Sequence, residues 1–224
     1  MHFEVPKSKF ESIREFAGEY LMIVVSIGTA LLLEHTVQTI HHRHLAEEAA
    51  QRMDAELRAN LMEMETIRKH NLEEGKQLSE LRDGLLKDIE DKTPEPLVVK
   101  HFMVAAKGSL SLSLQSPTLK HEAWDVAVAN QSASWMDPAL LLRYSSAYAS
   151  VRDMQLAANT SMTFLNGPQM IKTMTDLQMN TAVPHEMMYT LNQMISSYQM
   201  VNNTVRDISN ELKKAVPAQA AGKA

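Results

Sequence analysis

The sequence predicts an all-α protein, with one amino-terminal transmembrane helix that continues into a long amphipathic helix and then an antiparallel helical bundle. Three observations carry this prediction. An uncharged apolar run lies between Glu19 and Glu34. Acidic and basic residues then recur at the four-residue spacing of a helix, and two later segments carry apolar residues at alternating steps of three and four. The expected segments are a cytoplasmic stretch 1–15, the transmembrane helix 16–40, the amphipathic helix 41–92, the bundle domain 93–214 and a flexible tail 215–224.

Residues 16–40 are interpreted as a permanent membrane span rather than a cleaved signal or a buried core helix. The uncharged part between Glu19 and Glu34 covers about 21 Å of helix, less than the ~30 Å hydrocarbon core, but the whole stretch is long enough to cross it. The leader before it mixes basic with acidic residues, and no clear small-x-small cleavage site follows Leu33. A buried core helix would normally carry a polar face, which this stretch lacks. A signal peptide and a buried helix stay open as alternatives.

Four residues mark where this span meets its surroundings. Glu19 lies near one membrane interface and Glu34 near the other, where a carboxylate can reach headgroups or a partner. Ser26 and Ala30 are small residues one helical turn apart, which permits close approach of a second helix. The predicted partners of the span are therefore the lipid bilayer and either another membrane protein subunit or a second copy of the chain.

Basic residues flank the span unevenly: Lys7, Lys9 and Arg14 precede it, and Arg43 and Arg52 follow it closely. Lysine and arginine favour the cytoplasmic side of a membrane. The amino terminus is therefore expected inside and residues 45–224 outside. In a bacterium this places the chain in the inner membrane, with its bulk in the periplasm.

Residues 41–92 are predicted to form one long amphipathic helix. Acid-before-base pairs at a spacing of four support it: Glu48 with Arg52, Asp54 with Arg58, Glu65 with Lys69, and Asp83 with Lys87. An apolar line accompanies them, formed by Leu57, Leu61, Met64, Leu78, Leu85 and Ile89. Arg68, Asn71 and Gly75 interrupt this line, so the helix is expected to weaken near Gly75. Thr93-Pro94-Glu95-Pro96 then ends it, because proline lacks the amide hydrogen and disfavours helix in the preceding residue.

Proline signals divide the rest of the chain. Ser116-Pro117 and Asp137-Pro138 each place an N-cap oxygen before a proline at the first helical position, so a helix is expected to begin at each. Asn166-Gly167-Pro168 ends the second of these helices, and Pro184 begins the last one. Upstream of them KGSLSLSLQ alternates serine with Leu110, Leu112 and Leu114. It is interpreted as an extended connector that packs its leucines inward, because a lone strand has no sheet to join.

Two segments carry regular apolar seams. The first consists of Leu141, Tyr144, Tyr148, Val151, Gln155, Ala158, Met162 and Leu165. The second consists of Leu191, Met194, Tyr198, Val201, Val205, Ile208 and Leu212. Each seam presents one stripe to a neighbouring helix in the same or another chain, which predicts an antiparallel bundle or a coiled-coil assembly. The second seam, from Leu191 to Ile208, supplies the candidate partner contacts.

Four large aromatic side chains concentrate in one helix-turn-helix: Trp124, Trp135, Tyr144 and Tyr148. Aromatic residues make up only 5% of the chain, so this concentration predicts a single anchor cluster. Large rings dominate both core packing and interface hot spots. The cluster is interpreted either as an intramolecular core between two helices or as a partner site.

Several of these features together resemble an uncharacterised family of bacterial single-span membrane proteins. The resemblance is carried by Glu19, the apolar run and Glu34, by MDAELRANLMEM (Met53 to Met64), and by EAWDVAVANQSASWMDPALLLRYSSAY (Glu122 to Tyr148). In that family a span runs into a helix with an L-x-x-E-L-x-x-N-like pattern, and a later tryptophan helix precedes a helix that starts at Asp-Pro. The sequence departs from it at Glu34 and His35, where the family tends to carry uncharged amides and tryptophan. The resemblance implies an architecture and no particular activity.

No pattern in the sequence predicts catalysis, a cofactor or a metal site. The absence of cysteine excludes disulfides and thiolate chemistry, and a net charge of -5 without a basic stripe argues against nucleic acid as a partner. The stretch 185–189 begins like a zinc-protease helix, but Tyr189 stands where the second histidine ligand is needed. His35, His41, His42 and His44 are interpreted as interfacial. The methionines are interpreted as core residues, with metal binding as the alternative for both groups.

Three classes of function remain. The favoured one is a non-enzymatic structural or accessory subunit, anchored by one span, whose helical domain packs on itself or on a larger membrane complex. A single-span periplasmic ligand-sensing module is the first alternative. An enzyme is the least favoured, because no constellation of catalytic residues is found.

Overall fold

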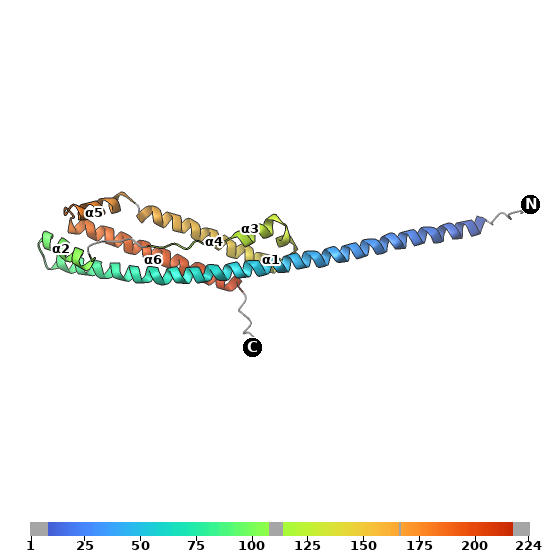
Figure 1. The fold of residues 1–224 in the computed structure, drawn as a ribbon, viewed down its shortest axis with the longest axis horizontal. Helices are drawn as coiled ribbons and strands as arrows, with labels where there is room; N and C mark the ends of the chain where they lie inside the picture. The colour runs from blue at the N-terminus through green and yellow to red at the C-terminus, as the bar shows by residue number, and fades with distance from the viewer. Residues whose placement is uncertain (1–8, 108–113, 166, 217–224) are drawn as a thin grey trace, which may run out of the picture.

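The computed structural model describes residues 9–107, 114–165 and 167–216, and every regular element among them is a helix (Figure 1). The predicted all-α class is therefore confirmed. The molecule is elongated, with long helices side by side and short helices at the two ends of the bundle. The last residues of the predicted flexible tail, from 217 on, lie outside the described residues.

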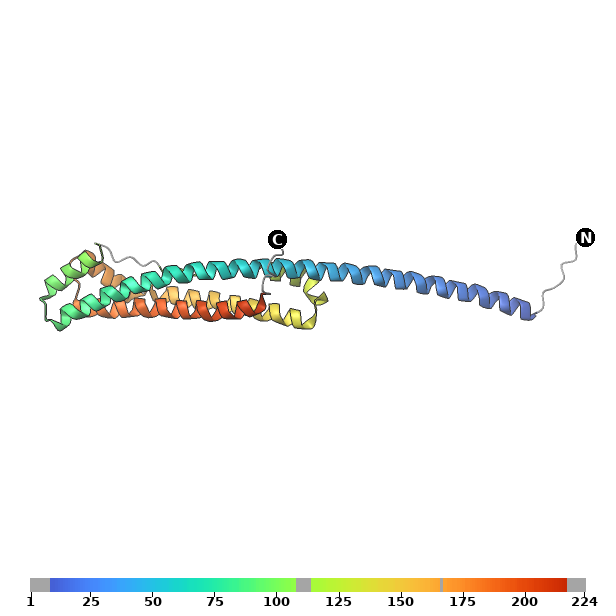
Figure 2. The same cartoon turned by 90° about the horizontal axis from the view of Figure 1, so that it is seen from below.

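Helix α1 (Lys9–Glu90) runs without a break through both the predicted span and the predicted amphipathic helix. Its 82 residues form a rod about 120 Å long. The first part stands alone and the second part forms one side of the bundle, as Figures 1 and 2 show. The expected weakening at Gly75 is wrong. Helix α1 continues through Gly75, where a Cβ would lie in ordinary van der Waals contact with the Cβ of Tyr198, at 3.5 Å.

The proline pair after α1 ends one helix and begins the next. The Thr93 amide donates to the Asp88 carbonyl at 3.0 Å, and Lys92 has a positive φ of 56°, which is the geometry of a Schellman C-cap. Helix α2 (Glu95–Ala105) then starts with a proline in its first turn. The sequence signal correctly placed the end of α1, but it did not separate α2 as a helix.

Three long helices form the bundle. Helix α4 (Pro138–Leu165) runs in the same direction as α1, and α6 (Pro184–Ala215) runs back in the opposite direction and packs against both (Figures 1 and 2). Helix α5 (Pro168–Gln178) joins α4 to α6. We call the end formed by α2 and the α5–α6 turn the far end. We call the end where α1 leaves the bundle, next to α3 (Glu122–Ala129) and the 3-10 helix η1 (Ser132–Trp135), the span-side end.

One of the two predicted N-caps is correct. The Asp137 carboxylate accepts hydrogen bonds from the amides of Ala139 and Leu140 at 2.9 and 3.3 Å, which starts α4 at Pro138 as expected. The helix predicted to begin at Ser116-Pro117 is wrong, because residues 114–121 are extended and α3 begins only at Glu122.

Two buried asparagines of α1 explain why residues 114–121 stay extended. Asn71 donates to the Gln115 carbonyl at 2.8 Å and accepts from the Gln115 amide at 3.0 Å. Asn60 forms the same pair of bonds with Lys120, at 2.8 and 2.9 Å. Eleven residues of helix and five residues of extended chain both span about 16 Å, so the two pairs are in register. From the other side, Gln155 of α4 donates to the Leu119 carbonyl at 3.2 Å.

The extended segment 114–121 therefore lies between α1 and α4 and bonds to both. Its own side chains Leu114, Pro117 and Leu119 are buried, which fits the predicted inward packing of the connector. Leu110 and Leu112, for which the same packing was predicted, lie outside the described residues.

The predicted seams form the hydrophobic core. In α6 the seam is buried throughout except for Ile208, which is half-buried. In α4 the described seam residues are buried or half-buried, and the side chains of Ala158, Met162 and Leu165 lie outside the described residues. In α1 the line is buried at Leu57, Met64, Leu78 and Leu85 and half-buried at Leu61 and Ile89. Helical periodicity alone thus located most of the core.

Candidate functional site

The first candidate site is the uncovered part of α1. Its apolar side chains from Phe16 to Ile40 are exposed, with Phe16 at 69% and Leu32 at 70%. Among the described residues, α1 provides the one helix that is long and apolar enough to cross a membrane. An exposed apolar surface of this size is typical of a site of membrane or protein interaction.

Several polar side chains within this part of α1 bond to the helix itself. Ser26 Oγ donates to the Met22 carbonyl at 2.8 Å, and Thr29 and Thr36 make the same bond to the carbonyl four residues earlier. At one end Gln38 Nε2 donates to Glu34 Oε1 at 3.1 Å. Such internal pairing is what a helix in hydrocarbon requires. Glu19, Ser26, Ala30 and Glu34 are all exposed, so each is available to lipid or to a partner helix.

The span-side end of the bundle carries a second exposed feature. The indole ring of Trp135 stacks on the His42 imidazole, with 3.7 Å between centroids and 5° between planes. Trp135 nevertheless stays 46% exposed, and Val126 and Val128 of α3 are 49% and 52% exposed. Trp135 therefore lies beside the point at which the uncovered part of α1 meets the bundle, whereas Val126 and Val128 point to different sides of α3.

The predicted aromatic cluster is divided between two places. Trp124 stacks on Tyr148 with 5.6 Å between centroids, and Tyr144 and Tyr148 are fully buried. Trp135 does not join them, because it stacks on His42 at the span-side end. The expectation of one cluster is therefore wrong for Trp135. The other three rings pack as an intramolecular core.

The two tyrosines of this core bond to carboxylates of α1. Tyr144 Oη donates to Asp54 Oδ1 at 2.8 Å, and Tyr148 Oη donates to Glu56 Oε1 at 2.8 Å. The Glu56 carboxylate also accepts from the Ala123 amide at 3.1 Å and so caps the start of α3. These bonds link α1, α3 and α4 at one level of the bundle. The sequence analysis missed Glu56, because an acid in an amphipathic helix normally faces solvent.

The buried tyrosines predict a loss of stability at high pH. Burial, together with the Asp54 carboxylate, raises the pKa of Tyr144 from 10 to about 12, and burial beside Glu56 raises that of Tyr148. Both phenols stay protonated in the folded state while they ionise in the unfolded chain. The contribution of these tyrosines to the free energy of unfolding is therefore fully present below pH 10 and declines as the pH rises toward 12. Thermal unfolding of wild type and Tyr144→Phe, measured at both ends of this range, should show a smaller decline in the variant. An equal decline would contradict the role of Tyr144.

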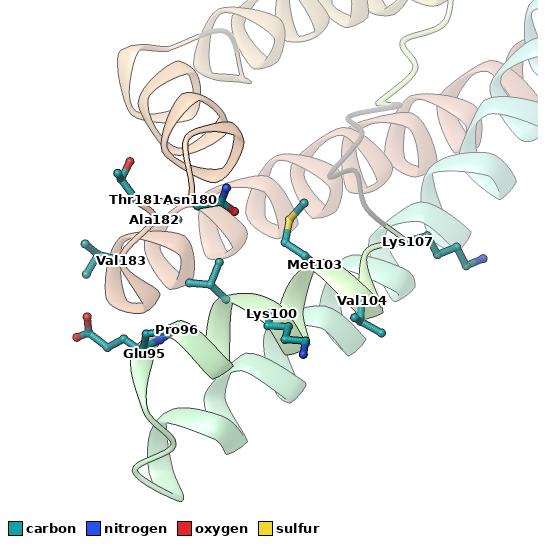
Figure 3. Close-up of a pocket in the computed structure, with 11 residues that line it drawn as sticks. Glu95, Pro96, Lys100, Met103, Val104, Lys107, Asn180, Thr181, Ala182 and Val183 are labelled. Carbon is teal, nitrogen blue, oxygen red and sulfur yellow. The ribbon is translucent and has the colours of Figure 1, made fainter.

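The far end of the bundle carries an open groove of about 840 Å³ (Figure 3). It lies between α2, which contributes Val99, Met103 and Val104, and the α5–α6 turn, which contributes Ala182 and Val183. Figure 3 shows Met103 extending from α2 toward α6. Lys100 and Lys107 stand at its edge, and no described residue forms an ion pair with either. The groove is therefore mainly apolar, and its polar lining consists of the two lysines, Glu95, Asn180 and Thr181. The sequence analysis missed it, because it depends on the separation of α2 from α1.

The predicted partner seam lies inside the chain. Leu191, Met194, Tyr198, Val201 and Val205 are each at most 3% exposed, since α6 packs against α1 and α4. The seam that periodicity located is thus filled by helices of the same chain. Surfaces left for a partner include the uncovered part of α1, the span-side end and the groove at the far end.

Residues with metal-binding chemistry are dispersed. No group of three or more His, Cys, Asp or Glu side chains that could hold a metal ion occurs among the described residues. His185 packs edge-on against Tyr189, with 4.9 Å between ring centroids, in the stretch that begins like a zinc-protease helix. Met170 and Met194 are buried in the core, where the sequence analysis placed the methionines, whereas Met200 is 43% exposed.

Comparison with known proteins identifies no relative. No protein-family model matches the chain, and no similar curated protein or solved structure is found. The resemblance to the family of bacterial single-span proteins therefore stays a prediction, and function is argued from the geometry alone.

Proposed function

We propose that the chain is a non-enzymatic accessory subunit, anchored by a single membrane span, whose helical domain holds a protein contact surface away from the bilayer. The observation that carries this proposal is the continuity of α1. One helix contains both the uncovered apolar residues 16–40 and the residues that form one side of the bundle core. A rigid helix transmits its position in the membrane directly to the bundle.

The length of α1 beyond the span sets the distance of the far end from the membrane. Fifty residues separate Ile40 from Glu90, which corresponds to about 75 Å along the helix axis. A bundle that served only to cover its own anchor would not need this length. The arrangement supports a spacer that presents the groove at the far end to another subunit.

The groove suits a protein partner of definite chemistry. Its walls are apolar, and Val104 at its edge is 72% exposed. Lys100 and Lys107 outnumber the one carboxylate of the lining, Glu95, so the rim carries a net positive charge. The expected partner surface is an apolar helix or loop flanked by carboxylates, which would cover the apolar walls and pair with the lysines. Within the membrane, the face with Ser26 and Ala30 would contact a second span.

Location and orientation follow from the basic residues near the span. The excess of lysine and arginine before residue 16 favours an inner-membrane protein with a cytoplasmic amino terminus and a periplasmic bundle. A reporter that is active only in the periplasm, fused after Ala224, is expected to be active. Activity of a cytoplasmic reporter at the same position would reverse this orientation.

The proposal is tested by purifying the full chain in mild detergent, with two variants that place the same charge on different exposed residues. Val104→Asp alters the groove, and Leu156→Asp alters an exposed position on α4 that is 67% exposed. A subunit that copurifies with wild type and with Leu156→Asp should be lost from Val104→Asp by at least tenfold. Membrane fractions should release the chain only with detergent. A wild-type chain that purifies alone, or that alkaline washing releases, would contradict the proposal.

A ligand-sensing module is the second candidate function, and the size of the groove favours it. A volume of about 840 Å³ lies within the range of small-molecule sites. A solute that raises the unfolding temperature of wild type, but not of Val104→Asp, would support this function. The accessory-subunit proposal would then lose its partner surface.

A further inference from the structure

We propose that the span-side end of the bundle is a lipid-contacting surface, in which Trp135, stacked on His42, lies in the headgroup layer. The inference rests on the proposed membrane span. It goes beyond it, because it assigns a membrane contact to residues that lie about ninety positions after the span in sequence.

The depth of Trp135 follows from the geometry of α1. His42 lies two residues after Ile40, so the stacked rings stand about 3 Å beyond the end of the span along the helix axis. The headgroup region of one leaflet is about 5 to 7 Å thick. A Trp ring at this depth would therefore lie within the interface, where indole rings are enriched in membrane proteins.

Helix α3 brings its exposed valines to the same end. The Ala123 amide bonds to Glu56, whereas the last turn of α3 lies beside Leu45 and Ala49. The helix thus descends along α1 toward the span. Its Val126 side chain is half exposed and lines a shallow hollow with Leu45, about 8 Å beyond Ile40 along the helix axis and thus at the outer edge of the headgroup layer. Val128 lies two positions later and points to another side of α3.

The charges at this level select the kind of contact. Arg43 and the neighbouring histidines are basic, but Arg43 bonds to Glu47 at 2.8 Å, and Arg52 bonds to Glu48 at 2.5 Å. The basic residues nearest to the bundle are thus partly neutralised by acids of the same helix. The expected contact is insertion of apolar rings into the interface of an ordinary zwitterionic bilayer, and it should be insensitive to salt.

Trp124 provides an internal control for this inference. It stacks on Tyr148, whose hydroxyl bonds to Glu56, at a level about 24 Å beyond Ile40. The chain has two tryptophans, so Trp124→Phe isolates the fluorescence of Trp135, and Trp135→Phe isolates that of Trp124. The ring of Trp135 is expected to touch lipid, and the ring of Trp124 is not.

The experiment reconstitutes each single-tryptophan variant of the full chain in phosphatidylcholine vesicles that contain brominated lipid. Bromines near the glycerol backbone should quench Trp135 at least threefold more strongly than bromines near the chain ends, and neither lipid should quench Trp124. High salt should leave this pattern unchanged. If Trp124→Phe lowers the unfolding temperature, Trp124→Tyr replaces it, because the larger phenol fills more of the space of the indole ring and its emission is distinguishable from that of tryptophan.

Flotation of the vesicles separates the two possible failures. If the chain floats with the vesicles and Trp135 is quenched no more than Trp124, the lipid-contacting surface is refuted and the span is unaffected. If the chain does not float, the membrane span itself is refuted, and the inference that rests on it falls as well.

Discussion

Replacing Val205 with aspartate is expected to lower the free energy of unfolding of the bundle by about 3 to 5 kcal/mol. Val205 is fully buried in the middle of α6. A carboxylate there would lose its hydration among the apolar side chains of the seam. Urea unfolding of the full chain in detergent, followed by the fluorescence of the two tryptophans, measures this change.

Asn203→Asp is the matched control for Val205→Asp. Residue 203 is on the exposed side of the same helix, two positions away, and the variant adds the same charge. Its free energy of unfolding should stay within about 0.5 kcal/mol of wild type. If both variants unfold like wild type, the seam of α6 is not a core.

The size of the Val205→Asp particle in detergent separates the two interpretations of the seam. If α6 packs against α1 and α4 of its own chain, the variant unfolds at lower urea without any change of subunit number before unfolding. If the seam instead held two chains together, the variant would first dissociate while it kept its helical signal. The buried position of Val205 leads us to expect the first result.

The parts of the fold that the sequence predicted are those fixed by local periodicity. The amphipathic part of α1 and the seam of α6 each repeat apolar residues at helical spacing, and such a repeat specifies which face is buried whatever the partner is. Asp137 likewise caps α4 through atoms two and three residues away. These elements could therefore be predicted from neighbouring residues, without knowledge of the tertiary structure.

The parts that the sequence did not predict depend on contacts between distant segments. Ser116-Pro117 has the local chemistry of a helix start. The backbone of the neighbouring Gln115, however, bonds to Asn71 of α1, which lies forty-four positions earlier in the sequence. Trp135 lies near other aromatic residues in sequence, yet its ring stacks on His42. In both cases a tertiary contact decided between structures that the local sequence allowed equally.

A signal for the connector was nevertheless present in α1. Asn71 appeared only as an interruption of the apolar line, and Asn60 lies eleven residues before it on the same face, since three helical turns take about eleven residues. A buried amide needs hydrogen-bond partners. Two amides on one apolar face therefore indicate that a backbone segment, and not a further apolar helix, lies against them.

Replacing both of these asparagines with alanine is expected to lower the free energy of unfolding by about 3 to 6 kcal/mol, with each single substitution contributing about half. Asn60 and Asn71 are 2% and 0% exposed, and each alanine would leave the carbonyl and amide of Lys120 or Gln115 without their partners. The effects should add, because about 16 Å of helix separates the two sites.

Hydrogen exchange identifies the cause of this loss. The amides of Gln115 and Lys120, which donate to the two asparagines, should be protected in wild type. Gln115 alone should lose its protection in Asn71→Ala, and Lys120 alone in Asn60→Ala, under conditions where the bundle remains folded. Asn203→Ala removes an amide from an exposed position and should change neither stability nor protection.

If both amides exchange rapidly in wild type, residues 114–121 are not held by α1, and the stabilising role of the two asparagines is refuted. If each variant loses protection at only one of the two amides, two asparagine side chains hold residues 114–121 in the place between α1 and α4 that a fourth helix would otherwise fill.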